Sequence, residues 1–154
     1  MAGIKVYLDN CTYNRPFDDQ TQIIITLEAE AKRHIQRLII NKDIDLAFSY
    51  VNRFENNKNP NAANRKAINE FFHNVSSYID YNSSQSVTIR AVAIKLSGIK
   101  TADAFHISCA IEGGCHYFIT TDKPLLKYKN HQIIICNPIQ FLDYMEEKRN
   151  AQHE

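Results

Sequence analysis

Short apolar runs alternate along the chain with longer segments in which apolar residues recur every three or four positions. The short runs are rich in β-branched and aromatic residues, which predicts strands. They are Ile4 to Leu8, Ile44 to Phe48, His116 to Thr120 and Ile133 to Cys136, with Tyr78 to Tyr81 as a short edge strand. Helices separate the strands and no tight hairpin joins two of them. We therefore predict an α/β fold, a Rossmann-like three-layer α/β/α sandwich with a mostly parallel central sheet.

The segment after the first strand is polar, and a long helical pattern follows it. Asn10 to Gln20 is predicted to be a loop, and Asp19 or Thr21 is a suitable N-cap for a helix that runs to about Asn41. Apolar residues spaced three and four apart form the stripe expected to face the core of this helix. They include Ile24, Leu27, Ala31, Ile35 and Leu38.

Two further helices carry polar residues of interest. Ser49 is placed to cap a short helix from Tyr50 to about Asn57. The helix predicted from Thr101 to Glu112 is apolar on nearly every side and should be buried, which makes its Asp103 and His106 noteworthy. His106 lies one turn after Asp103, and two interpretations stay open: a buried histidine with its own partners, or support for Asp103.

The length of 154 residues suits one domain, which we place at residues 1–147, with a frayed tail at 148–154. Hydrophobic residues make up 44% and charged residues 23%, as in a soluble globular protein. The net charge of +1 shows no gross polybasic signature for nucleic acid or membrane. If four acids were held around a cation, however, 18 basic residues would face 17 − 4 = 13 acidic ones on the remaining surface.

The cysteines and the apolar runs bear on location. No apolar run approaches the length that spans a bilayer and the first ten residues lack a signal pattern, so we expect a cytoplasmic location and no membrane contact. The cysteines form no Cys-x-x-Cys pair and no recognisable zinc spacing, so we expect buried, reduced thiols. They are Cys11, Cys109, Cys115 and Cys136.

Four acids occupy comparable places in the predicted fold. Asp9 ends the first strand and Asp122 comes just past a later one, while Glu55 and Asp103 lie on helices that follow strands. In a parallel sheet the strand ends and the starts of the following helices share one edge, so these acids can converge. Converging carboxylates raise one another's pKa unless a cation neutralises them, and all-oxygen ligands suit Mg²⁺ or Mn²⁺. Such a site would support metal-assisted hydrolysis.

Each acid alone has a simpler interpretation. Asp122 lies two residues before Pro124, which suits a helix start with an acidic cap. Asp103 is placed to cap its own helix, Glu55 to be a solvated helix residue and Asp9 to be a turn acid. The metal-site hypothesis therefore depends on the four acids occurring together.

Four blocks of sequence resemble the PIN-domain family, particularly the toxin-like members of bacterial toxin–antitoxin systems. They are Val6 to Cys11, Ser49 to Glu55, Thr101 to Ala110 and Phe118 to Asp122. The blocks occur in the family's order, and the resemblance covers roughly Ile4 to Cys136. It implies a PIN-like sandwich, a Mg²⁺- or Mn²⁺-dependent ribonuclease, and an acidic site of Asp9, Glu55, Asp103 and Asp122.

The resemblance also suggests supporting residues. Asn10 replaces a small hydroxyl residue that often follows the family's first acid, and Thr120 matches its threonine two residues before the last acid. Both are candidates to hydrogen-bond within the site. Arg15, Lys58 and Lys123 lie on predicted loops near its edge, as phosphate contacts or as solvated surface charges.

We therefore expect an endoribonuclease that hydrolyses RNA phosphodiester bonds. The resemblance further implies a toxin role, with a small antitoxin as partner and a homodimer. The alternative is a catalytically silent PIN-fold module that binds protein or nucleic acid. Phosphatases of the haloacid dehalogenase type are disfavoured, because Cys11 stands where their second aspartate would follow Asp9.

Overall fold

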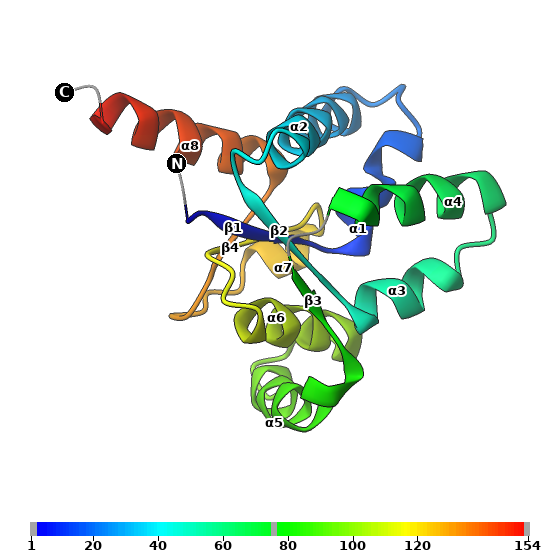
Figure 1. The fold of residues 1–154 in the computed structure, drawn as a ribbon, viewed down its shortest axis with the longest axis vertical. Coiled ribbons are helices and arrows are strands. Elements are labelled where there is room, and N and C mark those ends of the chain that lie inside the picture. Colours follow the sequence, from blue (N-terminus) through cyan, green and yellow to red (C-terminus); the bar gives the residue numbers. More distant parts are fainter. Residues whose placement is uncertain (1–2, 75–76, 153–154) are drawn as a thin grey trace.

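The computed structural model describes residues 3–74 and 77–152, and a five-stranded sheet lies at its centre (Figure 1). Its strands are β1 (Lys5–Leu8), β2 (Asp45–Ser49), β3 (Ser77–Ile79), β4 (Tyr117–Ile119) and β5 (Ile134–Cys136). Neighbouring strands are parallel in the order β3-β2-β1-β4-β5. The chain moves outward from β1 in one direction through β2 and in the other through β4. Connections consequently diverge at the carboxyl ends of β1 and β4 and open a crevice there.

Helices cover both faces of the sheet, which confirms the predicted three-layer sandwich. α2 (Ile23–Ile40) and α8 (Pro138–Gln152) lie on one face, and α5 (Ser84–Lys95) and α6 (Thr101–Glu112) on the other (Figure 1). The remaining helices are α1 (Asn10–Asn14), α3 (Tyr50–Asn57), α4 (Ala62–Phe71) and α7 (Lys123–Leu126), with 3₁₀ turns at Arg15–Phe17, Phe72–Asn74 and Tyr81–Ser83.

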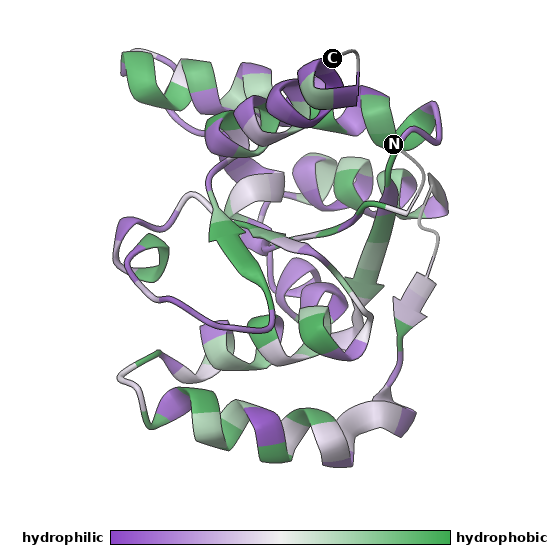
Figure 2. Cartoon of the chain, turned by 90° about the vertical axis from the view of Figure 1, so that its left-hand side faces the viewer, coloured by the Kyte–Doolittle hydropathy of each residue, from purple (hydrophilic) through white to green (hydrophobic). Residues whose placement is uncertain are grey.

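Two hydrophobic cores flank the sheet because successive strand residues point to opposite faces. On β1, Val6 and Leu8 join Ile35 and Phe141 in the core beneath α2 and α8, whereas Tyr7 belongs to the core beneath α5 and α6. Figure 2 shows the hydrophobic colour concentrated on the central strands, while the outer helices alternate between hydrophobic and hydrophilic residues. The alternation in β1 therefore places the Tyr7 hydroxyl on the α6 side.

The predicted loop from Asn10 to Gln20 is wrong over most of its length. α1 begins directly after Asp9, whose side chain accepts from the backbone N–H of Thr12, and Arg15–Phe17 form a 3₁₀ turn. An acceptor placed one residue before the helix satisfies a free N–H of its first turn, and this makes a five-residue helix possible in polar sequence.

The apolar stripe predicted for the long helix is also partly wrong. α2 starts at Ile23 and its N-cap residue Gln22 makes no side-chain cap bond. Ile24 and Leu27 are 42% and 50% exposed, while Glu28 is buried and forms an ion pair with Arg15 at 3.2 Å. The ion pair with Arg15 compensates the negative charge of Glu28 at this buried position.

The chain end departs from expectation as well. Residues 148–152, predicted to be a frayed tail, continue α8 as exposed helix. Residues 153–154 lie outside the described residues. Among the described helices, none combines the length and apolar character needed to cross a bilayer.

Candidate active site

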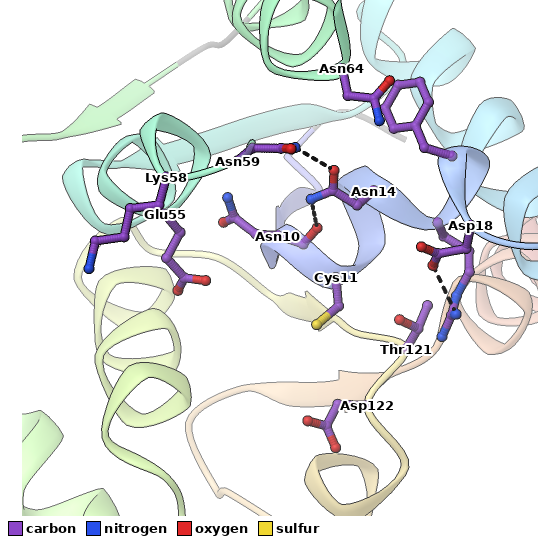
Figure 3. Close-up of a pocket in the computed structure, with 12 residues that line it drawn as sticks. Asn10, Cys11, Asn14, Asp18, Glu55, Lys58, Asn59, Asn64, Thr121 and Asp122 are labelled. Carbon is purple, nitrogen blue, oxygen red and sulfur yellow. Dashed lines mark hydrogen bonds and ion pairs between the residues drawn. The ribbon is translucent and has the colours of Figure 1, made fainter. Parts of the chain in front are cut away.

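A cleft of about 610 Å³ opens at the carboxyl edge of the sheet (Figure 3). Carboxylates and side-chain amides dominate its walls. The lining residues are Asn10, Cys11, Asn14, Arg15, Phe17, Asp18, Glu55, Lys58, Asn59, Asn64, Thr121 and Asp122. Figure 3 shows the carboxylates of Glu55 and Asp122 facing the same space from different elements, with Cys11 between them. The predicted convergence therefore has a physical space into which at least these two acids project.

Asp9 is only 2% exposed and is not itself a lining residue, whereas Asn10 and Cys11, which directly follow it, line the cleft. Its Oδ1 accepts from the backbone N–H and from the hydroxyl of Thr12, each at 3.0 Å, and its Oδ2 accepts from the Thr120 hydroxyl at 2.6 Å. Burial raises the pKa of Asp9, and the hydrogen bonds from Thr120 and Thr12 oppose that rise. Asp9 is thus the cap of α1, as the simpler interpretation expected, and it is also a buried carboxylate directly before two residues of the cleft.

Thr120 joins the first acid to the last. Its hydroxyl donates to Asp9 and accepts from the backbone N–H of Asp122 at 3.1 Å. Asp122 in turn caps α7, its Oδ1 accepting from the backbone N–H of Leu125 at 3.3 Å. Thr120 therefore links two of the candidate acids through its hydroxyl, and Asp122 is both a cap and a cleft residue.

Asp103 lies in the first turn of α6, but it is not the cap of that helix. The N-cap position is Lys100, and it makes no side-chain cap bond. Burial raises the pKa of Asp103, and the negative charges of Asp122, Asp9 and Glu55 raise it further. The capping interpretation is therefore wrong for this residue. The negative charges of the other three acids repel its carboxylate.

The negative charges of all four acids affect the pKa of the Cys11 thiol. Burial, followed by the charges of Asp9, Asp103, Asp122 and Glu55, raises the pKa of its thiol to about 12. The expectation of buried thiols is correct for Cys109, Cys115 and Cys136 and wrong for Cys11, which is exposed at the cleft although surrounding atoms still desolvate its thiol in part. Of the four acids, Glu55 and Asp122 line the cleft with Cys11, whereas Asp9 and Asp103 are not among its lining residues.

Glu55 is held by His106. The Nε2 of His106 pairs with Oε1 of Glu55, and its Nδ1 lies 2.6 Å from the Tyr7 hydroxyl. His106 is 2% exposed. It is therefore a buried histidine whose hydrogen-bonding partners are satisfied, as one interpretation proposed. The carboxylate that it contacts belongs to Glu55, whereas the other interpretation named Asp103.

An asparagine pair connects the helix of Glu55 to the strand of Asp9. Asn52 donates through Nδ2 to Oδ1 of Asn10 at 2.9 Å and to the carbonyl of Leu8 at 3.1 Å, and Asn10 donates to the Asn52 carbonyl at 3.0 Å. Asn10 thus supports the site through Asn52. Sequence reasoning missed Asn52. The signal that would have found it is the capping box with Ser49 three residues earlier.

The three candidate cations differ in their surroundings. Arg15 lines the cleft and is paired with Glu28 and Asp18 at 3.2 and 3.1 Å. Lys58 lines the cleft with its ammonium 4.2 Å from the centre of the Phe54 ring. Lys123, the first residue of α7, is not among the lining residues. Of the two cations that line the cleft, Arg15 is thus paired with acids, whereas Lys58 forms no ion pair within the described residues.

The donors suit a hard divalent cation, although they are not gathered around one point. Within residues 3–74 and 77–152, no group of three His, Cys, Asp or Glu side chains is placed to hold one ion together. All four candidate ligands are carboxylates, and the charges of three of them raise the pKa of the remaining one, Asp103. A cation would relieve that repulsion, so the chemistry of the donor set fits Mg²⁺ or Mn²⁺.

Comparison with known families decides the relationship. A family described as PIN domain matches residues 20–130 of the 154. The chain belongs to the PIN domain family. The matched region includes Glu55, Asp103 and Asp122 and begins after Asp9. PIN domains are generally nucleases, so cleavage of nucleic acid is the class of activity that the family indicates.

Solved structures agree on the fold. This chain superposes on a chain of VapBC2 from Rickettsia felis with a TM-score of 0.53 at 14% sequence identity. That crystal structure contains VapBC2 bound to a DNA fragment from its promoter. The match covers 87% of this chain and 98% of that one, and at this identity it shows a shared fold. The comparison with curated proteins gives no match. The family resemblance predicted from the four sequence blocks is confirmed.

Proposed function

We propose that this PIN domain is a Mg²⁺- or Mn²⁺-dependent endoribonuclease. The observation that carries the proposal is that the carboxylates of Glu55 and Asp122 line one cleft, while the Thr120 hydroxyl hydrogen-bonds both Asp9 and the backbone N–H of Asp122. Asp9, Asp103 and Asp122, with Glu55, would hold the ion. When bound, a divalent cation lowers the pKa of a water and stabilises charge on a phosphodiester.

The chain's own residues would keep these carboxylates in place. Thr120 and Thr12 hold both oxygens of Asp9, and α7 holds one oxygen of Asp122. His106 holds one oxygen of Glu55. Because each bond is to a neighbouring element, the acids would stay near one another despite their repulsion, which supports a site that waits for a cation.

The other wall of the cleft supports single-stranded RNA as the substrate. It presents the amides of Asn14, Asn59 and Asn64, and the Phe17 side chain is 45% exposed. Unpaired RNA bases are recognised by hydrogen bonds to their edges and by stacking on aromatic rings. Lys58 at the same cleft would contact a phosphate.

The toxin role and the partners are the remaining parts of the proposal. Ile23 on α2 is 77% exposed and lies beside the exposed Ile24 and Leu27, an apolar surface suited to a small antitoxin or to a second copy in a homodimer. We place the protein's action in the cytoplasm, where the four free cysteines would stay reduced.

The test is cleavage of an unstructured RNA in Mn²⁺ by the wild type, by Asp9→Asn and by Asp45→Asn. Asn retains the capping acceptor but lacks the charge, so Asp9→Asn should cleave at least about 100-fold more slowly. Asp45 lies at the opposite edge of the same sheet, so its substitution should change nothing. Equal rates for Asp9→Asn and wild type would identify the cleavage as contamination. DNA of the same sequence tests the preference for RNA.

A catalytically silent binding module is the second candidate, and the lack of a gathered three-ligand cluster among the described residues favours it. It predicts that wild type and Asp9→Asn bind the RNA equally and that neither cleaves it in Mn²⁺. Binding with no cleavage, measured on the same samples, would replace the nuclease proposal with this one.

A further inference from the structure

A closed ring of hydrogen bonds runs behind Glu55 through the core of the protein. The Tyr7 hydroxyl lies 2.6 Å from Ser49 Oγ and 2.6 Å from His106 Nδ1, and His106 Nε2 pairs with Glu55. Ser49 also caps α3, the helix that carries Glu55. The ring therefore returns to its starting point along five residues of that helix.

We propose that this ring, formed by Ser49, Tyr7, His106 and Glu55, is a positioning device for the carboxylate of Glu55. It rests on the function proposed above. Ser49 sets where α3 begins, and His106 sets where the carboxylate ends. Tyr7 connects the two from the central strand β1. The bonds of Ser49 and His106 to Tyr7 thus fix the position of both the backbone and the side chain of Glu55 relative to the sheet.

Burial fixes the geometry of the hydrogen bonds in this ring. Tyr7, Ser49 and His106 are all buried, and the Tyr7 ring stacks on Phe118 with centroids 5.5 Å apart. Buried polar groups that are fully paired have one arrangement, because breaking any bond leaves an unsatisfied group. Glu55 is the member of the ring that also lines the cleft. His106 takes its Oε1, which leaves Oε2 for a ligand in the cleft.

The direction of the bonds follows from donor chemistry. A carboxylate only accepts, so a neutral His106 must carry its proton on Nε2 to bond Glu55. Its Nδ1 must then accept, and the Tyr7 hydroxyl is the donor within reach. With the Tyr7 proton given to His106, the single hydroxyl proton of Ser49 goes to Tyr7, and Asn52 Oδ1, 3.2 Å from Ser49 Oγ, accepts instead from the backbone N–H of Ser49 at 3.1 Å. Tyr7 therefore selects the tautomer that presents a donor to Glu55.

The first experiment reads the tautomer directly and needs neither metal nor RNA. In ¹⁵N-labelled apo protein, His106, assigned by its absence in His106→Gln, should show the Nε2–H form. Tyr7→Phe keeps the aromatic side chain and removes the hydroxyl, so the population of the Nδ1–H form of His106 should increase. A wild-type His106 in the Nδ1–H form would overturn the proposal.

The second experiment measures the consequence for Glu55. Tyr7→Phe should lower Mn²⁺ affinity by calorimetry, and kcat with RNA, by on the order of 10–100-fold, as for groups that orient a metal ligand. Tyr117→Phe, on the neighbouring strand in the other core, is the matched control and should leave both unchanged. In a Glu55→Gln background, Tyr7→Phe should have no further effect. An equal loss in both backgrounds would contradict the proposal.

A third comparison separates positioning from packing. His106→Gln keeps a donor at the place of Nε2, so its Mn²⁺ affinity and kcat should stay within a few-fold of wild type. His106→Leu has no donor there and should lose as much of both as Tyr7→Phe does. Equal defects in the Gln and Leu variants would overturn the proposal. If wild type cleaves no RNA, the proposed function fails, while the tautomer and Mn²⁺ affinity still decide this inference.

Discussion

The cavities at the two edges of the sheet differ in their acidic residues, although the same strands form both edges. The cleft at the carboxyl edge is lined by the acids Asp18, Glu55 and Asp122. At the amino edge, a cavity of about 320 Å³ has no acid among its lining residues and instead presents His116 and Lys148, among others. A parallel sheet thus provides two different chemical environments within one domain.

Helix polarity explains the difference. Helices begin at the carboxyl edge, where Asp9 accepts from the first turn of α1 and Asp122 from that of α7. They end at the amino edge, where the Lys5 ammonium donates to the Gly113 carbonyl at the end of α6, at 3.1 Å. Free N–H groups and the positive end of the helix dipole favour acids, and free carbonyls favour cations. The fold therefore gathers acids at the edge where ligands bind.

The largest effect expected from breaking this asymmetry is on metal binding. Asp103→Asn should weaken Mn²⁺ binding by on the order of 100-fold, because it removes one oxygen ligand with its charge. Calorimetry on metal-free protein measures the change. Asp45→Asn, the acid at the amino edge, is the control and should bind as wild type does. Similar losses in both variants would show that general charge, rather than the cleft, attracts the ion.

The same variant sharpens the electrostatic argument through stability. Burial, and then the charges of the other acids, raise the pKa of Asp103, so removing its charge should not lower the metal-free melting temperature at pH 7. We expect a rise of about 2–4 °C, which corresponds to roughly 1 kcal/mol for a chain of this size. A marked fall would mean that Asp103 stabilises the start of α6.

The pH dependence of stability should have opposite signs with and without metal. Asp9 and Asp103 have raised pKa values, so the folded state binds more protons than the unfolded one between the ordinary range near 4 and the raised values. Their contribution to metal-free stability therefore falls as pH rises through that window. Mn²⁺ needs the ionised forms, so its stabilising effect should grow with pH, to about 2.7 kcal/mol at 100 times Kd.

Melting curves at several pH values, with and without Mn²⁺, measure both slopes. Asp9→Asn lacks the buried charge and should flatten both curves. A Mn²⁺ effect that is equal at low and neutral pH, or that persists in Asp9→Asn, would contradict a carboxylate site at this edge.

The smallest expected effect concerns RNA contact at the two edges. Lys58→Ala should weaken binding of single-stranded RNA a few-fold and reduce the salt dependence by about 0.7 in log–log slope, as for one lost phosphate contact. Lys148→Ala at the amino-edge cavity should leave both unchanged. Fluorescence titrations at several salt concentrations, with Asp9→Asn used to prevent cleavage, make the comparison. Equal effects would indicate nonspecific attraction.

Much of the fold could be predicted because local patterns determine it. The buried helix was predicted with the bounds observed, Thr101–Glu112, since its apolar run and the following glycines are local signals. The Ser49 cap of α3 was likewise local. The face of α2 was not, because the partner that draws Glu28 inward is Arg15, on a separate element.

By itself, the sequence predicted a parallel sheet with four acids near its carboxyl edge, because the order of strands and helices places the strand ends and the following helix starts there. Four blocks of the sequence also resembled the PIN domain family, to which the chain belongs. Only the tertiary structure decided which side chains hold each acid. His106 lies 51 residues from its partner Glu55, and Tyr7 lies 42 from Ser49. Contacts across such separations depend on how the layers pack, and no local pattern of apolar and polar residues records them.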